Sequence, residues 1–202
     1  MNQHPVVVRI GIRRVARALR VAGLYALRAC GAFRLAQYLT RSRLRILCYH
    51  GFAIGDEADL LPLMFMRATT FERRMSLIAQ RGLRVVTLDR AVELLRSSQV
   101  SRAETVITLD DGWATTLSVG VPILQRYGFP ASVYVTTQHL GSDCRVFNVA
   151  LNYMIRKTAR RALRLAEVHP ALDGVYDLSE PAKVLAQLTE TARAALSGRQ
   201  RG

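Results

Sequence analysis

The feature that most constrains the fold of this chain is a short apolar segment that ends in two adjacent carboxylates. Residues 105–109 are β-branched or apolar, and Asp110, Asp111 and Gly112 follow them directly. A short run of this kind is typical of a strand that is buried on both faces. We therefore expect a central strand with two acidic side chains at its carboxyl end.

A helix and a second strand are predicted immediately after these acids. The helical pattern ends at Gly128 and Pro130, and residues 131–137 have the composition of a strand. The apolar positions of this helix are Val119, Val121, Leu124 and Tyr127. Strand, helix and strand in this order predict a β-α-β unit, and α/β folds place their chemistry at the carboxyl ends of the strands.

Two neighbouring carboxylates repel each other unless one is protonated or a cation lies beside them. In a regular strand Asp110 and Asp111 would point to opposite faces, so they share one site only where the strand gives way to a turn. Gly112 supplies the backbone freedom for such a turn. Spacing alone leaves two interpretations open: a metal ligand beside a general base, or a solvated turn in which an Asp caps the next helix.

The alternation of strand and helix extends toward the N-terminus. In chain order, the patterns predict a strand, a loop, a helix, a strand and a helix over residues 44–50, 51–66, 70–82, 83–88 and 89–96. We expect Thr69 or Thr70 to cap the first of these helices and Asp89 to cap the second. The first helix has an apolar stripe of Phe71, Met75 and Ile78. Four short apolar strands joined by helices predict an α/β fold with a parallel sheet.

The N-terminal segment is strongly basic, because residues 1–45 contain ten arginines and no acid. Residues 6–40 predict a helix with arginines near one side and apolar side chains roughly opposite. The two sets are Arg13, Arg17, Arg20 and Arg28, and Val15, Leu19, Ala22, Ala26, Cys30 and Phe33. A basic amphipathic helix can lie on an anionic membrane, or it can pack on its own domain with a solvated arginine face. Both interpretations remain open.

Charge and composition also bear on partners and compartment. The formal net charge of +14 favours anionic surfaces, but no helix-turn-helix, zinc or RNA-binding signature indicates nucleic acid. The longest uncharged run of the basic segment, residues 21–27, is too short to span a bilayer, and no secretory signal is recognisable. Three scattered cysteines fit a reducing compartment. We expect a cytoplasmic protein or one that is peripheral at the inner face of the membrane.

The pattern changes after residue 141. Residues 147–166 and 181–196 predict helices, and no strand is predicted beyond residue 140. We therefore expect three regions: a basic amphipathic helical region over 1–43, an α/β region over 44–140, and a helical insertion with a frayed end over 141–202.

Three segments of the α/β region together resemble the polysaccharide deacetylases of the NodB-homology type, carbohydrate esterase family 4. They read ILCYHGF at 46–52, FERRMSLIAQRGLRVVTLDRAVELL at 71–95 and TLDDGWATTLSVGVPILQRYGFPASVYV at 108–135. The third is similar to the family's first signature, Thr-Phe-Asp-Asp-Gly, with Leu109 in place of the Phe. The resemblance implies the N-terminal half of a (β/α) barrel with parallel strands over residues 44–140.

The resemblance also implies a function and roles for four residues. The reaction would be metal-dependent removal of N-acetyl groups from an amino-sugar polysaccharide or oligosaccharide. By position, Asp110 would be the general base and Asp111 a ligand of a divalent metal, zinc or similar. His50 would contact substrate and Trp113 would flank a sugar subsite. From the residues alone, His50 is as well explained as a hydrogen-bonded histidine at a strand end, and Trp113 as a packed core residue.

The chain departs from the family in its histidines. The family's second signature supplies two further metal ligands as a His-x-x-x-His type pair, whereas His4, His50, His139 and His169 are far apart in this sequence. A catalytic metal usually has three protein ligands. We therefore expect a deacetylase truncated before the histidine motif, with an incomplete ligand set and doubtful activity on its own. The alternative hypothesis is a non-catalytic remnant that binds a membrane surface or a partner through its basic helix.

Overall fold

The structure, a computed structural model, describes residues 6–100, 103–137, 146–166 and 170–199. The chain divides into two compact units. The first consists of Met1–Arg45 and Leu83–Val106, and the second of Ile46–Gly82 and Ile107–Gly202. Strand β5 (Glu104–Leu109) begins in the first unit and ends in the second.

The basic segment of the first unit forms two helices instead of the single predicted one. Helix α1 spans Val6–Ala29 and helix α2 spans Ala32–Leu39. Between them Gly31 has a φ of +78°, the left-handed conformation in which glycine commonly ends a helix. Across the described ranges, no helix is both long enough and apolar enough to cross a membrane.

Strand β4 (Arg84–Val85) and helix α5 (Leu88–Arg96) complete the first unit. Strand β4 pairs in parallel with β5, and Arg84 lies opposite Glu104. The predicted strand over 83–88 is shorter than expected because its end is the helix cap: the Thr87 hydroxyl accepts a hydrogen bond from the Arg90 amide at 3.3 Å. The prediction that Asp89 caps this helix is therefore wrong.

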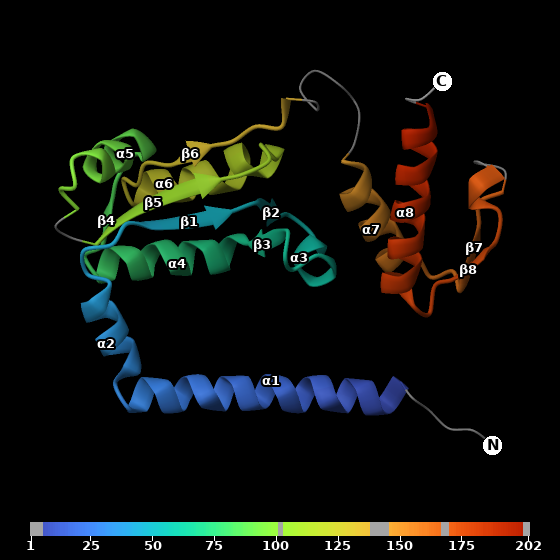
Figure 1. Ribbon diagram of the computed structural model, residues 1–202, viewed down its shortest axis with the longest axis horizontal. Helices are drawn as coiled ribbons and strands as arrows, with labels where there is room; N and C mark the ends of the chain where they lie inside the picture. The colour runs from blue at the N-terminus through green and yellow to red at the C-terminus, as the bar shows by residue number, and fades with distance from the viewer. Residues whose placement is uncertain (1–5, 101–102, 138–145, 167–169, 200–202) are drawn as a thin grey trace. The chain divides into compact units, whose positions relative to one another are not determined.

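The sheet is organised around β5, whose six residues are all buried. This strand is bonded to β1 (Arg45–Tyr49), β4 and β6 (Ser132–Val133), and its pairings with β4 and β6 are parallel. A mixed α/β fold with a buried central strand is thus confirmed (Figure 1). The predicted strand over 131–137 is reduced to the two residues of β6.

The segment predicted as a loop, residues 51–66, contains regular structure, so that prediction is wrong. It holds β2 (Gly51–Ala53), α3 (Glu57–Leu60) and the start of β3 (Phe65–Arg67). Strands β2 and β3 pair in parallel, with Gly51 opposite Phe65. A Cβ atom on Gly51 would meet the Phe65 ring at 2.5 Å, so this pairing depends on glycine. Phe52 and Phe65 are buried.

Helix α4 (Ala68–Gln80) begins before the predicted Thr70 and runs alongside β1 (Figure 1). Its N-cap is Arg67, whose side chain makes no capping hydrogen bond, so the prediction that Thr69 or Thr70 caps it is wrong. The predicted apolar stripe is confirmed, because Phe71, Met75 and Ile78 are all buried. The Phe71 ring contacts Tyr49 and Phe52, with ring centroids 4.9 and 4.7 Å apart.

The helix after the two acids contains a π-helical segment, Thr116–Gly120, followed by α6 (Val121–Arg126). The buried apolar side chains of α6 are Ile123 and Leu124. Of the predicted stripe of Val119, Val121, Leu124 and Tyr127, Leu124 is buried and the other three are half-buried. A π-helical turn holds one residue more than an α-helical turn, so it shifts every side chain that follows it. A regular 3.6-residue period therefore predicts Leu124 correctly here but misses Ile123.

Beyond residue 145 the second unit has its own small core. Helix α7 (Phe147–Lys157) is followed by strand β7 (Ala162–Arg164), a 3-10 turn (Pro170–Leu172), strand β8 (Val175–Asp177) and helix α8 (Pro181–Arg199). The buried residues of this core are Ile155, Val184 and Leu188.

Strands β7 and β8 form an antiparallel pair, so the prediction of an uninterrupted helix over 147–166 with no later strand is wrong. Leu163 pairs with Tyr176, and both pack against the small core. Packing of this kind joins segments that are distant in the sequence, so it leaves no local pattern.

Two helical glycines allow a test of the packing around Phe52. A Cβ atom at Gly120 would lie 2.5 Å from the Phe52 ring, which is 1% exposed and has no room to move. We expect Gly120→Ala to lower the free energy of unfolding by about 1–3 kcal/mol through overpacking. Gly23→Ala is the control, because a Cβ there meets nothing within 4 Å, and alanine is preferred in a helix by about 0.5–1 kcal/mol. Equal unfolding midpoints in urea for the two variants would contradict this packing.

Candidate functional site

The candidate site begins where β5 ends. Asp110 follows the strand, and the next two residues, Asp111 and Gly112, both have left-handed backbones with φ of +72° and +69°. Aspartate is one of the few residues besides glycine that tolerate this conformation. Gly112 is further constrained, because a Cβ atom there would lie 2.9 Å from Cγ1 of Val135. Because of this turn, the side chains of Asp110 and Asp111 lie in different surroundings and have different hydrogen-bond partners.

Asp110 is held against the end of β1. Its amide donates to the Tyr49 carbonyl at 2.8 Å, and its Oδ2 accepts a hydrogen bond from the Cys48 thiol at 3.1 Å. Its Oδ1 is buried and has no hydrogen-bond partner among the described residues. Leaving a buried carboxylate oxygen unpaired is costly, so this atom is suited to receive a proton, a water or a ligand.

Cys48 is affected by this contact in turn. Its hydrogen bond to Asp110, reinforced by burial, raises the pKa of the Cys48 thiol above its ordinary value of 9.0. The thiol therefore stays protonated at neutral pH and remains a hydrogen-bond donor to the carboxylate. Sequence reasoning missed Cys48. The sequence signal that could have identified Cys48 is its position two residues before His50, because residues two apart lie on the same side of a strand.

Asp111 belongs to a second hydrogen-bonded group. Its Oδ2 accepts hydrogen bonds from Nδ1 of His50 and from Nε1 of Trp113, each at 3.2 Å. Because a carboxylate oxygen accepts hydrogen bonds, Nδ1 of His50 is the donor in this contact. The His50 and Asp111 side chains are each 38% exposed, so this group faces solvent.

The structure thus brings three of the four predicted site residues into direct contact: His50, Asp111 and Trp113. Asp110, the fourth, lies next to them in the chain but bonds to Cys48. Trp113 also packs edge-on against Phe65, with ring centroids 5.0 Å apart. Its indole therefore both contacts the apolar interior and donates to the candidate site.

The residues present do not complete a site for the implied metal. His50 and Asp111 form a pair of suitable donors, but the part of the chain that the structure describes contains no group of three His, Cys, Asp or Glu side chains placed to hold a metal ion. A catalytic zinc ion usually has three protein ligands. His4, His139 and His169 lie outside the described residues.

Comparison with known proteins gives similar structures only. The chain is similar to IcaB from Ammonifex degensii (21% identity, TM-score 0.44, 50% of this chain and 42% of that chain). It is also similar to a de-N-acetylase from Aggregatibacter actinomycetemcomitans (24% identity, TM-score 0.38, 45% of this chain and 36% of that chain). A third similar structure is the deacetylase PplD from Streptococcus pyogenes, solved with acetate (18% identity, TM-score 0.43, 55% of this chain and 50% of that chain). No protein-family model and no curated protein sequence matches the chain.

Two of these three proteins are deacetylases by name. The chain spans half or less of the length of each solved structure that it matches. Because all three TM-scores are below 0.5, the functional argument rests on the residues of this chain.

The contact between Cys48 and Asp110 makes a testable prediction about thiol reactivity. Because the carboxylate raises the pKa of the thiol, Cys48 has less thiolate at any given pH than an ordinary cysteine and should react more slowly with iodoacetamide. We expect Asp110→Asn to move the pH profile of alkylation to lower pH and to speed the reaction at pH 8. The measurement uses a chain in which Cys30 and Cys144 are serine. An unchanged profile in Asp110→Asn would contradict the contact.

Proposed function

We propose that this chain carries part of the active site of a metal-dependent N-deacetylase that acts on acetylated amino-sugar polysaccharide or oligosaccharide. One observation carries the proposal: at the end of a central strand, next to the Asp111–His50 pair, Asp110 has a buried carboxylate oxygen with no hydrogen-bond partner among the described residues. The three sequence segments that resemble the polysaccharide deacetylases support the same reaction. In this proposal, β1, β4, β5 and β6 are strands of a partial (β/α) barrel.

Asp110 is the general base in this proposal. It takes the proton of the attacking water at Oδ1, while the Cys48 thiol holds the other carboxylate oxygen in place. The water oxygen forms a bond to the acetamide carbonyl carbon, the bond from that carbon to nitrogen breaks, and the nitrogen leaves with a proton. The products are acetate and a free amino group on the sugar.

Asp111 is this chain's metal ligand in the proposal, although one carboxylate does not complete a site. A divalent metal, when bound, polarises the amide carbonyl and lowers the pKa of its water to about 7. Within the chain, the hydrogen bond from Nδ1 of His50 holds the Asp111 carboxylate in place. The other ligands would come from outside the described residues.

Trp113 is the proposed substrate contact. Its indole is held by the hydrogen bond to Asp111 and by the edge contact with Phe65, so its orientation is fixed before substrate binds. Aromatic rings of this kind provide apolar contact area together with one polar group. The exposure of the neighbouring His50 and Asp111 side chains suits a long polymer, which has to reach the acids from solvent.

The proposal predicts separate effects for the two acids. When a form of the protein with a complete metal site is supplied with zinc, we expect it to release acetate from N-acetylglucosamine oligomers, and we expect Asp110→Asn to lower the rate by about 100-fold or more, because the base is lost. Asp111→Ala should lower both the rate and the affinity for zinc, whereas Asp110→Asn should lower only the rate. Acetate is measured by a coupled assay and zinc binding by calorimetry.

The matched control for these variants is Asp89→Asn, an exposed acid in the first turn of α5 that should keep the activity of the unchanged protein. Zinc binding that survives Asp111→Ala would refute the role of that acid. Acetate release that survives Asp110→Asn would refute the reaction as written, and so would zinc bound at a completed site without any acetate release.

A second candidate function, peripheral binding to an anionic membrane, is supported by the exposed apolar side chains of the basic helix α1. Leu19, Leu24 and Tyr25 are 67%, 53% and 66% exposed. The arginines Arg20 and Arg28 on the same helix are also exposed. An amphipathic helix of this kind binds anionic bilayers in two ways: its apolar side chains are buried in the bilayer, and its arginines are attracted to the anionic headgroups.

This second function predicts salt-sensitive binding to vesicles. We expect the chain to sediment with phosphatidylglycerol vesicles and to be released as the salt concentration rises, because the attraction is screened. The double variant Arg20→Glu and Arg28→Glu should bind more weakly, and so should Leu19→Asn. Asp110→Asn should bind as strongly as the unchanged chain. Equal binding to neutral phosphatidylcholine vesicles would contradict the electrostatic part.

A further inference from the structure

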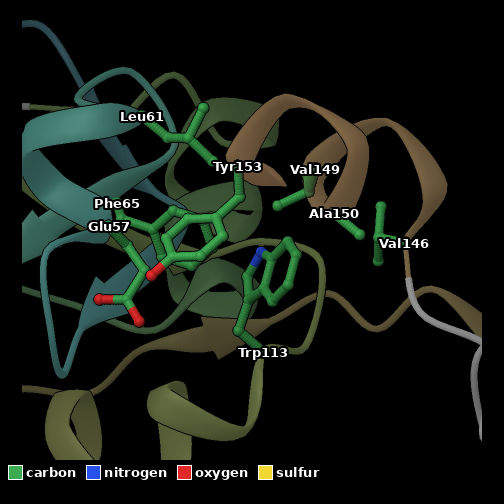
Figure 2. Close-up of a pocket in the computed structure, with 8 residues that line it drawn as sticks. All are labelled: Glu57, Leu61, Phe65, Trp113, Val146, Val149, Ala150 and Tyr153. Atoms are coloured by element: carbon green, nitrogen blue, oxygen red, sulfur yellow. The ribbon is translucent and has the colours of Figure 1, made fainter. Parts of the chain in front are cut away.

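A pocket of about 470 Å³ lies next to the candidate site, and apart from Trp113 its lining residues have no role in the proposed reaction (Figure 2). It is lined by Glu57, Leu61, Phe65, Trp113, Val146, Val149, Ala150 and Tyr153. Trp113 is shared with the candidate site, because its Nε1 donates to Asp111. The size is that of a pocket for a small organic molecule.

The walls of the pocket are almost wholly apolar. Three lining residues are aromatic, and four are aliphatic: Leu61, Val146, Val149 and Ala150. Phe65 and Trp113 pack edge to face, and in the view of Figure 2 the Tyr153 ring lies between the Glu57 carboxylate and the Trp113 indole. A sugar ring would leave most of its hydroxyl groups unpaired here, so the pocket selects a largely apolar molecule.

Glu57 is the one ionised group in this lining, and it differs from its acidic neighbours. Asp56 is paired with Lys157, and Asp59 with Arg67 at 2.5 Å. Within the described ranges Glu57 forms no ion pair, and its Oε2 accepts a hydrogen bond from the Gly55 amide at 2.8 Å. In a chain with a formal net charge of +14, a carboxylate that faces an aromatic pocket without a cation is a distinctive feature.

The wall formed by α7 is fixed by contacts beside the pocket. The Tyr153 hydroxyl donates to Oδ1 of Asp56 at 2.7 Å, and Lys157 on the same helix pairs with the other oxygen. These contacts lower the pKa of the Asp56 carboxyl, so Asp56 stays charged and the attachment persists in mildly acidic solution. Because Asp56 is engaged in this way, Glu57 remains the acid available to a ligand.

We propose that this pocket binds an organic ammonium ion with an apolar body. The ammonium group would lie between the Glu57 carboxylate and the faces of the aromatic rings, which attract cations through their negative π faces. The apolar body would occupy the aliphatic part of the pocket, where α7 supplies Val149 and Ala150. This site shares Trp113 with the proposed deacetylase site, and it adds a ligand class to the chain.

The test uses Trp113 as its reporter. It is the only tryptophan in the chain, so its fluorescence reports directly on occupancy of the pocket. The probes are 2-phenylethylammonium and its neutral analogue 2-phenylethanol, which share the apolar body and differ in the charged group. We expect saturable binding of both, with the ammonium bound about tenfold more tightly or better, because it forms a charge-assisted contact with Glu57.

Glu57→Gln keeps the shape of the side chain and removes the charge. We expect this variant to bind the two probes with equal affinity, through a loss of about tenfold or more for the ammonium alone. The matched control is Asp59→Asn on the same helix: it changes the net charge equally but removes an acid that is not part of the lining. This control should keep the preference for the ammonium.

Several results would overturn the proposal. Absence of saturable binding by the unchanged chain would do so, as would equal binding of the two probes. A preference that survives Glu57→Gln, or that falls equally in Asp59→Asn, would show general charge attraction instead of recognition by Glu57. The comparison of the two probes on the unchanged chain needs no variant, so the proposal stays testable even if a variant fails to fold.

Discussion

The candidate site depends on the close approach of the backbone at Gly112 to Val135. This approach forces two consecutive left-handed residues at the end of β5, and only glycine fits at the second of them. The chain then turns sharply enough that Asp110 remains against β1 while Asp111 reaches His50 and Trp113. Without this turn, the two acids would project to opposite faces of the sheet.

The parts of the fold that the sequence predicts well are those set by local pattern. The buried strand β5 and the stripe of Phe71, Met75 and Ile78 follow from short-range periodicity. The parts that it predicts poorly depend on distant contacts. Strands β2 and β3 form where Gly51 meets Phe65, and the β7–β8 pair packs on the small core around Ile155. Neither contact leaves a repeating signal in its own segment.

The same division applies to the candidate site. Asp110 and Asp111 stand out because two adjacent acids after an apolar run are unusual. Cys48 does not stand out, and its importance comes only from a contact 62 residues along the chain. Tyr153 and Asp56 are 97 residues apart. A pocket assembled across such separations requires the folded chain, because no local pattern relates its two walls.

The π-helical segment Thr116–Gly120 has a consequence for how this region can change in evolution. It is equivalent to an α-helix with one residue inserted. Removing one residue there would restore regular winding, and Ile123 and Leu124 could keep their places in the core. The start of the helix would rotate by about 100° relative to them, carrying Trp113 away from Asp111. The extra residue thus determines how the start of this helix, next to Asp111, is rotated relative to the buried side chains of Ile123 and Leu124.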